Sequence, residues 1–126
     1  MLKSAWWVAL GSVFGSLLRW ILTTTNDQNR LGTLIANLLG IALASFFLVF
    51  TERHASEAIR HFLLPGFCGG LTTFSAVMAI TLHEASGTLS IPAVSGARYL
   101  LVTVVLSLCT VAICIPSARR LIPVKK

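Results

Sequence analysis

The sequence predicts an all-α membrane protein with four transmembrane helices. Of its 126 residues, 56% are hydrophobic and only 11% are charged, and the mean hydropathy is +0.85. A soluble domain of this length needs a polar exterior, in which charged residues make up about a quarter of the chain. Four apolar blocks alternate with short polar connectors, and each is long enough to cross the hydrocarbon layer as a helix. They cover about residues 5–23, 31–51, 59–82 and 97–115, so that residues 1–126 form a single four-helix transmembrane domain.

The first two blocks carry small residues at helical intervals. Gly11 and Gly15 stand four residues apart in the first block, and Gly32, Ala36 and Gly40 repeat this interval in the second. Small residues at this spacing let the backbones of neighbouring helices approach closely. We therefore expect the first two helices to pack tightly against other spans.

One positive charge, Arg19, falls near the end of the first block, next to Trp20. A guanidinium in a membrane span is costly unless it reaches the interface or finds partners. Arg19 therefore either extends to the membrane surface beside Trp20 or attracts anions at the mouth of a pore. Its position alone favours the first interpretation.

Polar residues in the second and fourth blocks repeat on single helix faces. Thr33 and Asn37 are four residues apart, and an asparagine in hydrocarbon must find hydrogen-bond partners. The fourth block places polar residues on one face at i, i+4, i+8 and i+11, namely Tyr99, Thr103, Ser107 and Thr110. Each residue could bond its own backbone or a neighbouring helix. Together they could instead line a narrow hydrophilic path, in which the Asn37 amide supplies N–H donors to a small anion.

The third block contains the segment "GFCGGLTTFS", residues 66–75. Its glycines, threonines and serine weaken a helix, yet its flanks are as apolar as a membrane span. Non-helical backbone at membrane depth is tolerated only where protein or a cavity covers it, and its free backbone groups can hold ions. The segment predicts a broken third helix. This break either forms an ion site, with the ring edge of Phe74 toward an anion, or is a kink with Phe74 packed against it.

The distribution of basic residues predicts the orientation of the chain. With four spans, one side of the membrane receives both termini and the second connector, and the other side receives the first and third connectors. The first side holds Lys3, Arg53, Arg60, Arg119, Arg120, Lys125 and Lys126, and the second holds Arg30 and Arg98. Because basic residues stay cytoplasmic, both termini are expected inside the cell.

The same charges argue against several functions. No acidic residue falls inside a span, because Asp27, Glu52, Glu57 and Glu84 stand at block ends or in connectors. Proton-coupled export needs an ionisable relay in the membrane, so a small four-helix cation or drug exporter is the weaker alternative. The sequence shows no catalytic triad and no metal-ligand cluster, so we do not expect an enzyme. The net charge of +6 is spread between apolar blocks, which does not favour nucleic-acid binding. If the protein were a scaffold held only by small-residue packing, the polar stripe of the fourth block (Tyr99, Thr103, Ser107 and Thr110) would have no function.

The motifs "GSLLRW", "GTLIANLLG" and "GFCGGLTTFS" resemble those of the Fluc/CrcB fluoride channels, and the resemblance covers all four spans. It implies an antiparallel two-subunit assembly, one subunit inverted relative to the other, that exports fluoride passively across the bacterial inner membrane and gives fluoride resistance. It implies two pores along the subunit interface and a structural sodium ion (Na⁺) at the centre. The backbone carbonyls of Gly69 and Thr72 would hold this ion. Asn37, Phe74 and Ser107 match pore residues of the family, and Arg19 matches its first-span arginine.

Two departures from the family pattern bear on the assembly. The family usually reads "TTFSTF" where this chain reads "TTFSAV", so Val77 replaces a second phenylalanine and Ala76 a threonine. Near Ser107, Thr103 and Leu106 stand where the family often has Asn and Gly. A subunit that inserts in both orientations should also show little charge bias, and this chain shows seven basic residues against two. The chain is therefore either one half of a heterodimer or a diverged homodimer that tolerates Val77.

Overall fold

The computed structural model describes residues 2–25, 29–54, 56–85 and 92–123, and within these ranges every regular element is a helix. The helices are α1 (Leu2–Thr24), α2 (Asn29–His54), α3 (Glu57–His61), the π-helix η1 (Phe62–Cys68), α4 (Gly69–Leu71), α5 (Phe74–Ala85) and α6 (Pro92–Leu121). Among the described residues, four stretches are long and apolar enough to cross a membrane, namely Ser4–Thr24, Arg30–His54, Glu57–His83 and Gly96–Leu121. The prediction of an all-α protein with four membrane-spanning helices is confirmed at this level.

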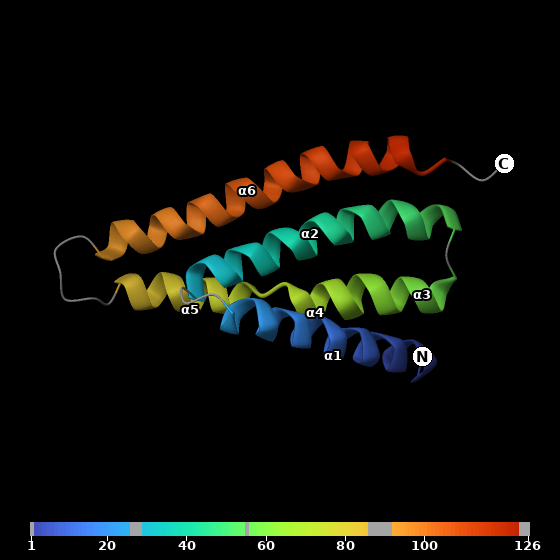
Figure 1. Cartoon of the computed structure of the whole chain (residues 1–126), viewed down its shortest axis with the longest axis horizontal. Helices are drawn as coiled ribbons and strands as arrows, with labels where there is room; N and C mark the ends of the chain where they lie inside the picture. The colour runs from blue at the N-terminus through green and yellow to red at the C-terminus, as the bar shows by residue number, and fades with distance from the viewer. Residues whose placement is uncertain (1, 26–28, 55, 86–91, 124–126) are drawn as a thin grey trace.

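The four spans lie side by side, with α1 at one side of the bundle and α6 at the other (Figure 1). Helix α1 packs on η1 and α4, whereas α6 packs on α2 and α5. Because successive spans run in opposite directions, α1 begins, α2 ends, α3 begins and α6 ends at the same end of the bundle (Figure 1). The side expected to be cytoplasmic includes four described arginines. They belong to the helices whose ends meet at this end of the bundle: Arg53, Arg60, Arg119 and Arg120.

The outer surface of the bundle is apolar. Large side chains such as Trp6, Trp20, Leu101 and Leu108 are mostly exposed, each with about two thirds of its surface accessible. In water this exposure would be unfavourable at about 25 cal/mol for each Å², but hydrocarbon solvates these side chains well. The exposed surface is therefore one that suits a lipid bilayer.

Glycines hold α1 against the third span. A Cβ atom on Gly11 would collide with the carbonyl oxygen of Phe62, and one on Gly70 would lie 2.6 Å from the carbonyl oxygen of Ser12. A Cβ on Gly66 would lie 2.9 Å from the carbonyl oxygen of Val8. These approaches are backbone to backbone, so a neighbouring side chain cannot move aside to relieve them. The close packing expected from the small residues is present between α1 and the third span.

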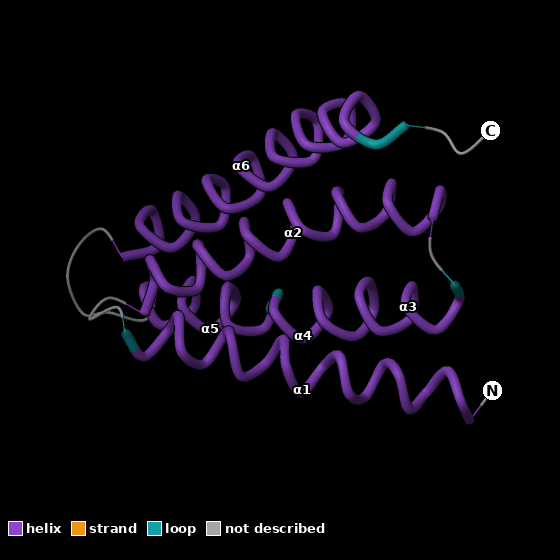
Figure 2. Tube along the Cα trace, turned by 45° about the vertical axis from the view of Figure 1, so that its right-hand side comes forward, coloured by secondary structure: helices purple, strands orange, loops and turns teal. Residues whose placement is uncertain are grey.

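The glycines of residues 66–75 remain helical. Gly66 lies in η1, Gly69 and Gly70 form α4, and only Thr72 and Thr73 adopt no helix. Thr72 is extended, with φ −81° and ψ 149°, and Figure 2 shows the pair as a short loop in the middle of the third span. Glycine composition overstates the length of the non-helical part, because packing against α1 stabilises the helix that intrinsic propensity disfavours.

The fourth helix is longer than its apolar block. It begins at Pro92, before the predicted block, and continues past Ile115 to Leu121, with Pro116 inside it. The hydroxyl of Ser117 donates to the carbonyl oxygen of Ile113 at 2.7 Å, which adds a hydrogen bond where proline supplies no N–H. Arg53 of α2 also donates to the carbonyl oxygens of Arg119 and Ile122. These contacts extend α6 beyond the range that hydropathy predicts.

Candidate functional site: a cavity beside the third span

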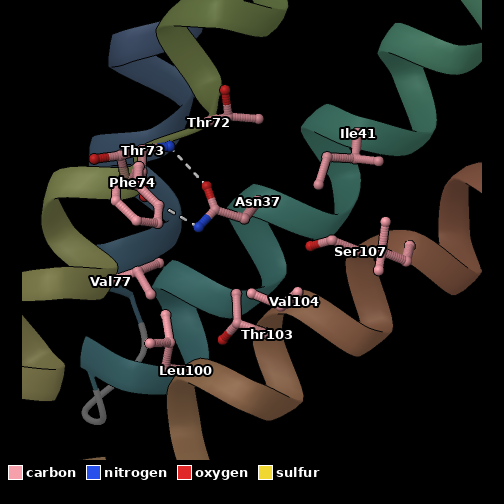
Figure 3. A pocket seen from close by; sticks show the side chains of 11 residues that line it. Asn37, Ile41, Thr72, Thr73, Phe74, Val77, Leu100, Thr103, Val104 and Ser107 are labelled. Carbon is pink, nitrogen blue, oxygen red and sulfur yellow. Dashed lines mark hydrogen bonds between the residues drawn. The ribbon is translucent and has the colours of Figure 1, made fainter. Parts of the chain in front are cut away.

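A cavity of about 330 Å³ opens between α2, α6 and the non-helical pair of the third span (Figure 3). Four of the residues expected along an anion path line it, and they come from three different spans: Asn37, Phe74, Thr103 and Ser107. Thr72, Thr73 and Val77 line it as well, together with the apolar side chains of Ile41, Leu100, Val104 and Leu108. The cavity is thus mostly apolar, with a few polar groups that converge on it.

Asn37 joins the second span to the non-helical pair. Its Oδ1 accepts a hydrogen bond of 2.7 Å from the backbone N–H of Thr73, and its Nδ2 donates one of 3.2 Å to the Thr73 carbonyl oxygen (Figure 3). The side chain, only 6% exposed, therefore satisfies both backbone groups of one residue, as a neighbouring strand would. One amide N–H has no acceptor among the described residues, and it remains available to a ligand.

Thr73 also caps the helix that follows it. Its Oγ1 accepts a hydrogen bond of 3.3 Å from the backbone N–H of Ala76, the third residue of α5, and lies 3.1 Å from the Oγ of Ser75. This is the usual N-cap arrangement, which satisfies one of the free N–H groups of the first turn. Phe74, the first residue of α5, has 70% of its surface exposed. The positive end of the α5 dipole and an exposed aromatic ring thus meet at the cavity.

The polar stripe of the fourth span is only partly available to a ligand. Thr103 and Thr110 donate to the carbonyl oxygens of Tyr99 and Leu106 in their own helix, both at 2.8 Å. Tyr99 donates to the carbonyl oxygen of Arg30 at 3.2 Å. Ser107 lines the cavity, and its hydroxyl has no hydrogen bond to another described residue. Of the stripe, Ser107 is the hydroxyl best placed to bind an ion.

Three predicted site residues lie outside the cavity lining. Thr33 is 3% exposed and buried within the bundle, so it is enclosed by protein in this chain. Gly69 belongs to α4, and Arg19 lies on α1, where its Nη1 donates to the carbonyl oxygen of Thr72 at 3.4 Å. Arg19 therefore contacts the third span, so a guanidinium at this position has a polar partner within the bundle.

The residues expected to hold sodium offer backbone oxygens and no carboxylates. The N–H of Thr73 donates to Asn37 and not to the carbonyl of Gly69, four residues earlier, so the Gly69 oxygen lacks this helical partner. The Thr72 oxygen has a donor, Arg19. No group of three or more His, Cys, Asp or Glu side chains gathers within the ranges that the structure describes. Carbonyl oxygens suit a hard cation, so the donors fit sodium, although one of the two is shared with a guanidinium.

Sequence reasoning missed the role of Thr73. The motif pointed to the carbonyls of Gly69 and Thr72, but both backbone groups of Thr73 pair with Asn37. The sequence signals the Asn37–Thr73 contact only by an asparagine in one span and a glycine–threonine segment in another. Packing between the two spans determines which threonine lies opposite the asparagine. The apolar side of the cavity, formed by residues such as Ile41 and Leu100, carries no sequence signal at all.

The structure is that of a small membrane protein with four spans. Its third span contains a non-helical pair, and hydrogen-bond donors converge on a cavity beside it. Residues 6–115 match the family described as "CrcB-like protein, Camphor Resistance (CrcB)". Because this match covers most of the chain, the protein belongs to the CrcB family.

Proteins named as fluoride-specific ion channels are among the similar sequences. "Fluoride-specific ion channel FluC 1" of Streptococcus pneumoniae is 42% identical over 73 residues, which cover 56% of this chain and 64% of that protein. "Fluoride-specific ion channel FluC" of Psychrobacter arcticus is 46% identical over 78 residues, or 57% of this chain and 63% of that protein. A protein of the same name from Pseudomonas syringae pv. maculicola is 41% identical over 91 residues, 65% of this chain and 69% of that protein. The chain thus spans slightly less than two thirds of the first two relatives.

Proposed function

We propose that this chain is a subunit of a fluoride-specific channel that lets fluoride leave the cytoplasm passively and so gives fluoride resistance. Membership of the CrcB family and the names of the similar proteins support this proposal. The observation that carries it furthest is the convergence of Asn37, Phe74, Thr103 and Ser107 on one cavity (Figure 3). These residues come from three spans, and an anion path would need them at the same place.

The chemistry of the cavity suits a small, strongly hydrated anion. Fluoride loses its water only where donors replace it closely, and a fixed positive charge on the path would trap it. The free N–H of the Asn37 amide, the Ser107 hydroxyl and the positive ring edge of Phe74 are donors without net charge. The first turn of α5 adds a helix N-terminus at the same point. These groups would offset dehydration while letting the ion move on.

We also propose the assembly that the family resemblance implies. The non-helical Thr72–Thr73 pair would be the broken part of the third span, covered at membrane depth by an inverted second subunit. The exposed ring of Phe74 is consistent with a face that such a subunit covers. A structural sodium ion would be held by the carbonyls of Gly69 and Thr72, where it would neutralise the carbonyl ends of the broken span. It would brace the two subunits together and would not itself be transported.

The partner is either a second copy or a homologous subunit. The bias of seven basic residues against two favours a fixed orientation, with both termini in the cytoplasm of a bacterial inner-membrane protein, and hence a heterodimer. Expression of this chain alone in a fluoride-sensitive host that lacks its own channel tests the point. Full rescue of growth in fluoride without a partner would exclude the heterodimer.

Fluoride efflux from reconstituted vesicles, recorded with a fluoride electrode, tests the channel proposal. Ser107→Ala removes a hydroxyl from the cavity, and Ser117→Ala on the same helix removes one that bonds the carbonyl of Ile113 away from the cavity. We expect efflux to fall in the first variant and to stay at the wild-type rate in the second. Wild-type vesicles that retain fluoride, or equal rates in the two variants, would contradict the proposed path.

A further inference from the structure

One face of α1 directs three side-chain donors toward carbonyl oxygens of the third span. The Ser12 hydroxyl lies 3.4 Å from the Gly66 oxygen, although its shorter bond, 2.9 Å, is to Val8 of its own helix. Ser16 donates to Gly70 at 3.5 Å, and Arg19 donates to Thr72 at 3.4 Å. The donors stand at i, i+4 and i+7, which places them on one helix face. Two of the three are neutral, and the third is a cation. The cation is the one that reaches the non-helical pair.

The carbonyl end of the first half of this span carries a partial negative charge that its own helix does not neutralise. The last carbonyls of a helix have no intrahelical donors, and together they amount to a partial negative charge. Here the N–H of Thr73 is turned to Asn37, so it does not reach the carbonyl of Gly69. The Thr72 oxygen would likewise lack a donor without Arg19. A cation at this point is stabilising, and the chain already supplies one.

Arg19 has no anionic partner among the described residues. The structure gives its guanidinium one hydrogen bond, to the Thr72 carbonyl oxygen, and no ion pair within the described ranges. A buried or half-buried charge needs a partner of opposite sign or several dipoles. The negative end of the half-helix is the partner that the fold offers. Arg19 therefore occupies, as a tethered cation, the end of the helix at which sodium would bind.

We propose that Arg19 and a small monovalent cation such as sodium compete for the Thr72 carbonyl, so that Arg19 determines how strongly the folded protein depends on that cation. This inference rests on the proposed function for the existence of the cation site. A carbonyl oxygen has two lone pairs and can accept two partners, but two positive charges on one oxygen repel each other strongly in a medium of low dielectric constant. Bound sodium therefore weakens the arginine contact, and the arginine contact weakens sodium binding.

Thermal unfolding of the purified protein tests the competition without any transport measurement. Sodium chloride would replace N-methyl-D-glucamine chloride at constant ionic strength, and the rise in melting temperature would give the midpoint for sodium. The variants are Arg19→Gln, which removes the charge, and Arg19→Lys, which keeps it. The matched control is Ser16→Ala, which removes the neighbouring hydrogen bond from the same helix face without changing charge.

We expect the midpoint for sodium in Arg19→Gln to fall at least about tenfold below that of the wild type, because removing a neighbouring charge of this kind strengthens cation binding by that order. Arg19→Lys and Ser16→Ala should stay close to the wild type. An unchanged or higher midpoint in Arg19→Gln would overturn the competition, as would the absence of any sodium response in every variant. A fall of the same size in Ser16→Ala or Arg19→Lys would also overturn it, because charge would then not be the cause.

A second measurement needs no folded charge-removal variant. In wild-type protein labelled with ¹⁵N-arginine, the guanidinium signal of Arg19, assigned from Arg19→Lys, should shift when sodium replaces N-methyl-D-glucamine. A signal that stays in place under saturating sodium would refute the inference. Fluoride efflux of the same preparation keeps the two proposals apart. Lost efflux with a retained sodium shift would contradict the channel function alone, whereas normal efflux without the shift would contradict only the competition.

Discussion

Replacing Asn37 by alanine removes both hydrogen bonds that hold Thr73 to the second span. These bonds measure 2.7 Å and 3.2 Å, and the asparagine is 6% exposed. The substitution leaves a backbone N–H and a backbone carbonyl without partners, and an unpaired buried group costs about 1–3 kcal/mol. Water that enters the cavity would satisfy part of this loss. We therefore expect a destabilisation of about 3 kcal/mol, which corresponds to roughly a hundredfold change in the unfolding equilibrium.

Reversible unfolding of the detergent-solubilised protein in a titration with dodecyl sulfate measures this loss. Ser45→Ala is the matched control, because Ser45 lies on the same helix and is as buried as Asn37, but its hydroxyl donates only to the carbonyl of Ile41 in its own helix. That carbonyl keeps its helical hydrogen bond, so the control should change stability by less than about 0.5 kcal/mol. Equal stabilities of the two variants would refute the assignment of Asn37 as the partner of Thr73. Fluoride efflux should fall in the Asn37 variant as well, since the cavity loses its amide.

Three further outcomes are expected. Gly70→Ala should destabilise the protein by about 1–3 kcal/mol in the same titration, because the new Cβ meets the α1 backbone at 2.6 Å. Gly69→Ala should leave stability unchanged, because its Cβ has its nearest neighbour 4.0 Å away. Equal losses in the two variants would contradict the packing argument. Val77→Phe should raise fluoride efflux severalfold by adding a second ring edge to the cavity. Val77→Leu fills space without adding a ring, so it should lower efflux. If both variants changed efflux in the same direction, the ring would be excluded as the cause. Arg53→Gln removes the guanidinium that donates to the end of α6, including its bond to the Ile122 carbonyl. The substitution should lower the free energy of unfolding by about 1 kcal/mol and speed hydrogen exchange at the end of α6. Exchange at the wild-type rate would show that the contact does not hold the helix end.

The four spans could be predicted because each depends on its own residues. A block of apolar residues of sufficient length favours a helix across hydrocarbon, whatever the other blocks do. The grouping of Asn37, Phe74 and Ser107 followed from a motif resemblance and not from periodicity. The stripe of the fourth span, by contrast, predicted four equivalent residues, and the structure separates them. Thr103 and Ser107 line the cavity, but the Thr103 hydroxyl, like that of Thr110, donates to a carbonyl of its own helix.

The extent of the non-helical segment could not be read from the sequence, because packing between spans determines it. The glycines that weaken an isolated helix are the residues that admit α1, since a Cβ at Gly66 or Gly70 would lie against its backbone. The helix therefore continues through them, and the interruption falls on Thr72 and Thr73, which are not small. The contact of Arg19 with the third span was missed for a related reason, because its partner is a carbonyl 53 residues away.

In this segment the glycines admit the backbone of α1, and the threonines form the non-helical pair. Fewer contacts therefore remain for a second subunit to supply. Non-helical backbone at membrane depth needs cover by protein or a cavity, and the family resemblance implies an inverted second subunit that could supply it. Within one chain, Asn37 already pairs with both backbone groups of Thr73, Arg19 reaches the carbonyl of Thr72, and the Thr73 hydroxyl caps α5. A partner is therefore not required for these hydrogen bonds. In the assembly that we propose, the partner would cover the exposed ring of Phe74 and add a second set of carbonyls near the Gly69 oxygen. Loss of the partner should then release the proposed sodium ion before it unfolds the span.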